Sequence, residues 1–341
     1  MLITFLHKDI LLWLVTVVLV FSGCQTSPVL IKRSQMLMGT LVDVTAVAPD
    51  KAVAQEAATA ALEEIKRLEK LLSTWISTSE LSQINTAAGR NPVRVSPESM
   101  GVIERSLEIA GLTEGAFNIA VGPAVNAWNV SKEGRIPSLK ELNALRPLID
   151  LSQVKLDHDS RTVYLGRRGM EIDIGGIGKG YAADQAIVVM QASGATAGVV
   201  ALSGDIETFG RMPDNQRFVF GIQHPRKEHG QLLARIELEN EAVSTAGDYQ
   251  RFFEVNGIRY HHILDPKTLQ PSRASQSVTV FAKEGVVADG LDTGIFVMGR
   301  EKGMALIESL LGVEGIIVDS DGKVWVSSGL KGRLQIEDSN P

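Results

Sequence analysis

Apolar residues recur at helical spacing in several parts of this chain, most clearly over residues 51–72. This segment (KAVAQEAATAALEEIKRLEKLL) consists largely of residues with high helix propensity, so we expect one continuous helix. Similar patterns predict further helices over 97–110, 138–145, 181–192, 286–298 and 302–311. Residues 73–85 and 115–128 show no helical period, and we expect an irregular polar segment and a loop there.

Alternation of apolar and polar residues predicts strands in much of the remaining chain. Residues 218–223 and 232–238 alternate as an antiparallel pair would, and Asn256-Gly257 is the preferred two-residue turn for a hairpin over 252–260. Further strands are expected at 36–47, 197–202 and 277–282, with hairpin turns at 158–161 and 319–322. No linker, repeat or low-complexity stretch interrupts this mixture. It predicts a single α+β domain of mostly antiparallel sheets with packed helices.

The densest cluster of glycines lies in residues 171–184 (EIDIGGIGKGYAAD), where we expect a short strand, a turn and a helix that starts near Tyr181. The glycines of this turn permit positive φ angles and a close approach of the backbone to a ligand. The free N–H groups at the start of the helix would face that ligand. Asp173 and Lys179 bring both charge signs to the turn, which suits a phosphate with a hydroxylated or metal-bound neighbour.

This turn matches neither of the common phosphate-binding motifs. A P-loop requires glycine where Asp173 stands and Ser or Thr where Gly180 stands. The dinucleotide fingerprint requires glycine where Tyr181 stands. On these residues alone, a plain strand-to-helix turn packed against a sheet is an equal alternative.

Composition and charge narrow the class of protein. The hydrophobic and charged fractions, 44% and 22%, are those of an ordinary globular protein. A net charge of −6 without a basic cluster argues against a nucleic-acid surface.

The N-terminus departs from this globular composition. Residues 10–21 form an apolar run too short to span a bilayer comfortably, with basic residues before it and small residues after it, which is the layout of a secretion signal. Cys24 follows and is the only cysteine, and Phe-Ser-Gly-Cys resembles a bacterial lipoprotein signal, in which the cysteine is lipidated. A signal anchor or a buried cysteine is the alternative. We therefore expect a lipoprotein signal peptide at 1–23, a tether at 24–34 and the folded domain at 35–333.

Two short segments carry candidate chemistry outside the glycine turn. His261 and His262 are adjacent in a predicted strand, so at most one of them faces a given site. Asp289 and Thr293 lie four residues apart on a predicted helix, where a carboxylate and a hydroxyl on one face would form part of an Mg²⁺ shell. Asp292 would repel Asp289, which favours a nearby cation, although a solvated helix face explains the same spacing.

Several further motifs follow one another along the chain. In order, the set comprises Met38-Gly-Thr40, Ser73-Thr-Trp75 with Ser79-Glu-Leu-Ser82, Val121-Gly-Pro123 with Trp128, the glycine turn, Ser203-Gly-Asp-Ile206, Thr245-Ala-Gly-Asp-Tyr249, His262-Ile-Leu-Asp-Pro266, and Ala288-Asp289 with Thr293. Together, over residues 30–330, this set resembles the ApbE family, the FAD:protein FMN transferases of bacterial cell envelopes.

The resemblance implies a T-fold-like domain that binds FAD and Mg²⁺, transfers FMN to a threonine hydroxyl of an acceptor protein, and releases AMP. It implies that His262 is the base that takes the proton from the acceptor threonine. It assigns Mg²⁺ to the carbonyl of Gly176 and to Asp289 and Thr293. The implied FAD contacts are Met38, Trp75, Ala116, Phe117, Asn118, Asp173, Lys179 and Ile263.

The resemblance also implies partners and a location. Acceptors in this family carry a motif of the form Asp-x-x-Ser/Thr-Gly-Ala-Thr, as in flavin-bearing subunits of sodium-pumping quinone oxidoreductases and related complexes. A lipidated Cys24 would anchor the protein in the bacterial cell envelope, facing the periplasm, with the inner membrane as the expected site. The stretch Ser193-Gly-Ala-Thr196 mimics the acceptor motif, but Met190 stands where its Asp should be, and we expect a helix end entering a strand there.

Four positions depart from the family pattern. Ala246 stands in place of Ser, Leu269 in place of Gly, Asn118 in place of Asp, and Asp292 in place of a small residue. None removes the implied base or metal ligands, but the changes at Ala246 and Asn118 would weaken FAD handling. Two alternatives to transfer therefore stay open: an FAD pyrophosphatase that uses water and gives FMN and AMP, and a non-catalytic FAD-binding lipoprotein.

Overall fold

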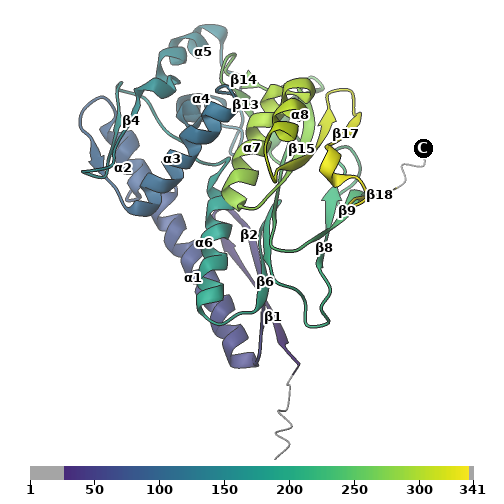
Figure 1. Cartoon of the computed structure of the whole chain (residues 1–341). Helices are drawn as coiled ribbons and strands as arrows, with labels where there is room; N and C mark the ends of the chain where they lie inside the picture. The colour runs from purple at the N-terminus through teal and green to yellow at the C-terminus, as the bar shows by residue number, and fades with distance from the viewer. Residues whose placement is uncertain (1–26, 338–341) are drawn as a thin grey trace, which may run out of the picture.

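An eight-stranded antiparallel sheet forms the centre of the computed structural model, which describes residues 27–337 (Figure 1). The strands lie in the order β1-β2-β6-β7-β10-β15-β16-β17. Their bounds are β1 (Val29–Leu37), β2 (Thr40–Ala48), β6 (Ala197–Leu202), β7 (Asp205–Phe209), β10 (Ala242–Gly247), β15 (Ser275–Ala282), β16 (Glu314–Asp319) and β17 (Val324–Val326).

Helices cover one face of this sheet. Helix α1 (Lys51–Leu72) packs on β1 and β2, α6 (Gly178–Ala192) on β6 and β7, and α7 (Gly285–Met298) on β10 and β15. Helices α3 (Pro97–Leu112) and α8 (Arg300–Ser309) pack against α7 in turn. Because α7 is covered on several sides, most of its residues are buried, including two aspartates.

A second, three-stranded sheet covers the opposite face. It has the order β18-β9-β8, with bounds β18 (Gln335–Ile336), β9 (Leu232–Leu238) and β8 (Phe218–Gln223). Successive side chains of a strand point to opposite faces, so Val280 joins the core beneath the helices and Phe281 joins the core beneath the second sheet. The central strands are therefore apolar on both faces.

Shorter elements gather at the end of the fold where α1 finishes, in the upper part of Figure 1. The helical ones are α2 (Glu80–Ala87), η1 (Ile119–Val121), α4 (Gly122–Trp128), α5 (Leu139–Leu145), η2 (Arg146–Leu148), η3 (Leu151–Gln153) and, elsewhere, η4 (Ser328–Leu330). The strands are β3 (Val93–Arg94), β4 (Val154–Asp157), β5 (Thr162–Leu165), β11 (Phe252–Val255), β12 (Ile258–His261), β13 (Leu264–Asp265) and β14 (Gln270–Pro271).

Most predicted elements are confirmed. Helix α1 has the predicted bounds, and Asp50 caps it by accepting the N–H of Val53 at 3.0 Å. Strands β8 and β9 pair as predicted, and β11 and β12 form the predicted hairpin with positive φ at both Asn256 and Gly257. The single α+β fold with antiparallel sheets is also confirmed.

Two segments expected to be irregular contain helices. Helix α2 begins at Glu80, where the Ser79 hydroxyl accepts the N–H of Ser82 at 3.1 Å. Helix α4 occupies the second half of the expected loop 115–128, and it ends at Asn129 in the left-handed conformation. These helices have only 8 and 7 residues, and neither shows a clear helical period in the sequence.

The glycine-dense segment also differs from the prediction. Residues 171–173 form no strand, because their backbone groups bond elsewhere: the Asn85 side chain pairs with both the N–H (2.8 Å) and the carbonyl (3.0 Å) of Ile172. Helix α6 begins at Gly178 rather than near Tyr181.

The expected signal peptide at 1–23 and Cys24 lie outside the described residues. Strand β1 begins at Val29, inside the range 24–34 that we expected to be a tether. Within residues 27–337, no helix combines the length and apolarity needed to cross a membrane.

Candidate active site

A pocket of about 460 Å³ lies beside the C-terminal end of α1. Its walls come from the segment after α1, from α2, from α4 and the loop that follows it, and from residues 171–173. The polar and aromatic side chains that line it include Trp75, Asn85, Asn126, Lys132, Glu171, Asp173 and His262. Three predicted site residues from distant parts of the sequence, Trp75, Asp173 and His262, therefore meet in one pocket.

One wall of the pocket carries an aromatic side chain, Trp75, with the Lys132 ammonium over its ring. Trp75 is 68% exposed, and the Lys132 ammonium lies 4.6 Å from the centroid of its ring. An indole face on a pocket wall suits stacking on a planar heterocycle. Sequence reasoning missed Lys132, which lies in a loop and carries no motif.

Two carboxyl groups project from the segment that Asn85 holds in place. The Asn126 amide donates to Glu171, and burial raises the pKa of the Glu171 carboxyl. Asp173 accepts the N–H of Gly175 at 2.6 Å, and burial raises its pKa as well. Sequence reasoning had assigned Asp173 but had not assigned Glu171.

His262 faces the pocket, and its surroundings define its tautomer. Its Nδ1 lies 3.3 Å from the backbone carbonyl of Arg251. A carbonyl can only accept, so Nδ1 carries the hydrogen and Nε2 is left as an acceptor. Desolvation, helped by the Arg251 and His261 side chains, lowers the pKa of His262 to about 3, so the imidazole is neutral over the physiological range.

A buried cluster of three aspartates lies where α6, α7 and β7 meet. Asp205 on β7 and Asp289 and Asp292 on α7 bring carboxylate oxygens within 4.8 Å of one another. Desolvation and the neighbouring Asp205 raise the pKa of Asp289 to about 7. Desolvation and Asp289 together raise the pKa of Asp292 well above its usual range. Such mutual repulsion is relieved when a cation binds.

Lys179 and Ser244 complete this acidic cluster. Lys179 forms an ion pair with Asp205, and although burial opposes its charge, Asp205 and Asp289 raise its pKa. The Ser244 hydroxyl lies within hydrogen-bond distance of Asp205 and 2.6 Å from Asp292. One ammonium against three carboxylates leaves the cluster short of positive charge, which suits a divalent cation.

The residues implied as metal ligands also come together. A side chain on Gly176 would lie 3.0 Å from the Thr293 hydroxyl, so this backbone and Thr293 are neighbours. Thr293 donates to Asp292 at 3.1 Å, one turn of helix from Asp289. Carbonyl, hydroxyl and carboxylate oxygens form the donor set that Mg²⁺ takes, and these residues therefore fit the ion.

The glycines of the turn act differently from the prediction. None of Gly175, Gly176, Gly178 and Gly180 has a positive φ. A Cβ on Gly180 would overlap the carbonyl oxygen of Gly285, so Gly180 permits α6 and α7 to touch. The N–H of Gly180, in the first turn of α6, donates to the Asp289 carboxylate at 2.9 Å. This N–H group therefore bonds to a side chain of the protein, whereas the prediction had it facing a ligand.

Other implied FAD contacts lie outside the pocket lining. Met38 occupies the β1–β2 turn with φ 50°, and its N–H donates to Glu69 at 2.6 Å. Ala116 precedes the buried Phe117, whose ring lies close to Gly176. Ile263, the residue after His262, is buried.

Asn118 has a structural reason to depart from Asp. Its carbonyl oxygen accepts the N–H of Ala120 at 2.8 Å, and its amide donates to the carbonyl of Ile149 at 3.0 Å. An aspartate would make the first contact but could not make the second.

Comparison with known proteins gives a consistent result. The model of the ApbE family matches residues 38–317. A protein of Vibrio cholerae serotype O1 named FAD:protein FMN transferase is 31% identical over 328 residues, covering 94% of this chain and 98% of that protein. The crystal structure of the ApbE protein of Thermotoga maritima is similar with a TM-score of 0.84 and 30% identity, covering 89% of this chain and 99% of that one. The flavin transferase ApbE of Vibrio cholerae is similar with a TM-score of 0.80 and 31% identity, covering 90% and 99%.

Proposed function

The chain belongs to the ApbE family and is a flavin transferase, and we propose that it moves FMN from FAD to a threonine hydroxyl of an acceptor protein in an Mg²⁺-dependent reaction. The observation that carries this proposal is His262, with Nε2 free, in a pocket that Asp173 also lines. Asp173 leads directly into the glycine turn, whose Gly180 bonds to Asp289 of the acidic cluster.

The chemistry is one displacement at phosphorus. The threonine oxygen attacks the phosphorus of the FMN half of FAD, a new P–O bond forms, and the bond to the AMP phosphate oxygen breaks. AMP leaves with the bridging oxygen and its electron pair. His262 Nε2 accepts the proton that the hydroxyl loses, because a threonine hydroxyl is a poor nucleophile until a base assists it.

The acidic cluster and Lys179 would neutralise the diphosphate. Asp289, Thr293 and the carbonyl of Gly176 would hold Mg²⁺, with Asp205 and Asp292 adjacent. When bound, the ion supplies charge stabilisation at the phosphoryl oxygens. Lys179 contributes a fixed positive charge, and Trp75 supplies an aromatic face for one ring of FAD.

The acceptor and the location are part of the same proposal. The acceptor carries the threonine of an Asp-x-x-Ser/Thr-Gly-Ala-Thr motif. The enzyme is exported and anchored in the bacterial cell envelope, at the inner membrane, through a lipidated Cys24. Replacing Cys24 with Ala should move the protein from the membrane fraction to the soluble fraction. Unchanged fractionation would contradict the anchor without touching the transfer reaction.

The test follows both products of the reaction. The domain is incubated with FAD, an acceptor that carries the motif, and either Mg²⁺ or EDTA, and AMP and protein-bound flavin are quantified. We expect one AMP per flavin attached, and neither product in EDTA. AMP with free FMN would support the pyrophosphatase instead, and FAD bound without AMP would support the carrier.

A further inference from the structure

We propose that His261, the buried neighbour of His262, is a positioning residue that fixes the orientation of the catalytic base. The proposal rests on the function proposed above for His262. It concerns a side chain that does not line the pocket and that touches neither FAD nor an acceptor in the reaction as proposed.

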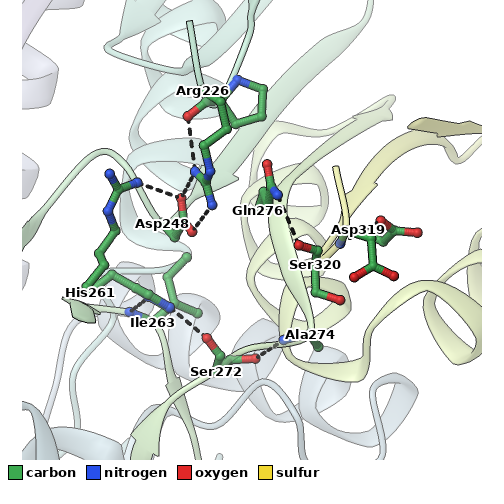
Figure 2. A network of polar contacts seen from close by, with 12 residues as sticks. Arg226, Asp248, His261, Ile263, Ser272, Ala274, Gln276, Asp319 and Ser320 are labelled. Atoms are coloured by element: carbon green, nitrogen blue, oxygen red, sulfur yellow. Dashed lines mark hydrogen bonds and ion pairs between the residues drawn. The ribbon is translucent and has the colours of Figure 1, made fainter. Parts of the chain in front are cut away.

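Both ring nitrogens of His261 are used within the protein (Figure 2). The residue is 1% exposed. Its Nδ1 accepts the N–H of Ile263 at 3.2 Å, and its Nε2 lies 2.7 Å from the carbonyl oxygen of Ser272. An amide can only donate and a carbonyl can only accept, so His261 is the neutral tautomer with hydrogen on Nε2. A ring with both positions satisfied is locked in one orientation.

These two hydrogen bonds of His261 hold the backbone around His262. The Nδ1 bond spans the residue itself, from position 261 to position 263, and fixes the backbone turn from which the catalytic ring projects. The Nε2 bond ties that turn to the next segment, where the N–H of Ser272 donates back to Ile263 at 3.0 Å. The Ser272 hydroxyl in turn accepts the N–H of Ala274 at 3.4 Å.

The ring of His261 also contacts the helix that carries the acidic cluster. It meets the ring of Phe296 edge to face, with centroids 5.5 Å apart and an interplanar angle of 76°. Phe296 lies on α7, which also carries Asp289 and Thr293. One buried side chain therefore sets the spacing between the base and the proposed metal ligands.

The strand before His261 is anchored independently. Asp248, directly after β10, accepts two hydrogen bonds from Arg226, at 2.7 and 2.6 Å (Figure 2). It accepts a third from Arg259 on β12 at 3.4 Å. This ion-pair network thus anchors β12, whose last residue is His261.

Three substitutions separate the two bonds. The side-chain oxygen in His261→Asn replaces Nδ1 and keeps the Ile263 contact but is too short to reach Ser272. The amide in His261→Gln reaches toward Ser272 and loses the Nδ1 position. His261→Phe keeps the packing on Phe296 and loses both bonds. Ser106→Ala, which removes a buried hydroxyl bond inside α3, is the matched control for stability alone.

Transfer kinetics provide the first readout. We expect His261→Phe to lower kcat by about tenfold or more, while the KM for FAD changes by less than about twofold, because the base is misaligned and FAD binding is untouched. His261→Asn should retain more of kcat than His261→Gln, because it keeps the bond that spans His262. Equal kcat values for all variants, or losses that match the loss of folded protein as in Ser106→Ala, would overturn the proposal.

A second readout does not depend on catalysis. The ¹⁵N shifts of the His262 ring report its tautomer. In the wild type we expect hydrogen on Nδ1, and in His261→Phe, or in His261→Gln if the Phe variant does not fold, we expect a mixture of tautomers. An unchanged single tautomer would overturn the role of His261, whereas a wild type that fails to transfer FMN would overturn the proposed function instead.

Discussion

At the scale of single residues, the site combines an imidazole that is neutral at physiological pH with carboxyl groups that hold protons unusually tightly. The pKa of His262 is lowered to about 3, so acid does not titrate it until far below neutral pH. The pKa of Asp289 is raised to about 7, and that of Asp292 is raised well above its usual range. Protons therefore bind the aspartates at a higher pH than the histidine, and would compete there with the proposed metal ion.

The raised pKa values of the aspartates predict how the proposed Mg²⁺ requirement depends on pH. Mg²⁺ needs ionised carboxylates, so the half-saturating Mg²⁺ concentration should rise by about tenfold for each pH unit below 7 if one proton is displaced. At saturating Mg²⁺, the rate should change little between pH 6 and 8. Initial rates measured against Mg²⁺ at pH 6, 7 and 8 check this, and a half-saturating concentration independent of pH would contradict it.

Leu269 gives a prediction on stability. It stands at φ 60°, where a side chain is strained, yet it is fully buried, and its carbonyl accepts the Trp128 indole N–H at 2.7 Å. Leu269→Gly relieves about 1–2 kcal/mol of backbone strain but removes a buried side chain worth about 2–5 kcal/mol. We expect a net loss of about 1–3 kcal/mol in urea unfolding.

The matched control for Leu269 is Asn256→Gly, which has a similar φ of 52° at an exposed hairpin turn. It should leave the free energy of unfolding within about 0.5 kcal/mol of the wild type. A Leu269→Gly variant as stable as this control would contradict the prediction, because the relief of strain would then fully offset the lost packing.

The sequence could predict that two residues share one face of a helix. It could not predict which residues the pairing of strands brings together. The spacing of Asp289 and Thr293 identified a helix face that the structure places beside Gly176. Asp205 lies on β7, far away in the sequence, and only strand pairing brings it to α7. Its place in the Ser203-Gly-Asp-Ile206 motif was the one available signal. Asp292, noted for its repulsion of Asp289 and as a departure from the family pattern, belongs to the same cluster.

At the scale of elements, the contact between α6 and α7 builds the site. The two helices approach so closely at Gly180 and Gly285 that neither position has room for a side chain. This contact places Lys179 from one helix beside Asp289 from the other. The glycine turn is thus a helix-packing device as well as part of the proposed ligand site.

Gly180→Ala tests this contact. The added Cβ would overlap the Gly285 carbonyl oxygen and lie 2.8 Å from the Asp289 Cβ, so α7 must shift. We expect a loss of about 1–3 kcal/mol in thermal unfolding and a weaker apparent affinity for Mg²⁺ in the transfer assay.

Gly101→Ala in α3 is the control for Gly180→Ala, since a Cβ at position 101 would meet no other atom within 4 Å. It should stabilise the protein by about 0.5–1 kcal/mol through helix propensity alone. If Gly180→Ala stabilised the protein as Gly101→Ala is expected to, the close contact between α6 and α7 would be contradicted.

Long helices, which repeat the hydrophobic period several times, could be predicted from the sequence. Short elements that side-chain hydrogen bonds hold in place could not. The 22 residues of α1 show their period plainly, and its bounds were correct. Helix α2 has only 8 residues and begins at a Ser79 cap within a polar segment. Residues 171–173 looked like a strand, but the Asn85 side chain takes the place of a neighbouring strand.

At the scale of the whole molecule, a pair of buried carboxyl groups joins the helical layer to the sheet. Asp184 on α6 accepts the N–H groups of Gly285 and Val286 at the start of α7, at 2.6 and 2.9 Å. Glu207 on β7 lies against it. Desolvation and Asp184 raise the pKa of Glu207 to about 10, and desolvation raises the pKa of Asp184.

This carboxyl pair predicts how stability depends on pH. Glu207 is protonated in the folded state and ionised in the unfolded state between about pH 5 and 10, so folding takes up a proton. Stability from this group is full below the unfolded pKa and declines as pH rises, by at most about 1.4 kcal/mol per pH unit. Glu207→Gln should flatten the decline in denaturant unfolding between pH 6 and 9.5. A wild type whose stability is constant over this range would contradict the protonated pair.

The layered fold was predictable only in class. Alternating and helical patterns gave an α+β domain with antiparallel sheets, because each strand and helix shows its own period. They did not give the second sheet on the opposite face, since Val280 and Phe281 look alike in sequence although they join different cores. Strand order depends on pairings between distant segments, which local patterns do not contain.

The central claim is that His262 directs FMN from FAD onto a protein hydroxyl. The most direct test is the intact mass of an acceptor protein after incubation with FAD, Mg²⁺ and either the wild-type enzyme or His262→Ala. We expect a mass gain equal to FMN minus water with the wild type, and a loss of at least about a hundredfold in its rate with the variant. An unmodified acceptor in the presence of active, FAD-consuming wild type, or equal modification by His262→Ala, would contradict it.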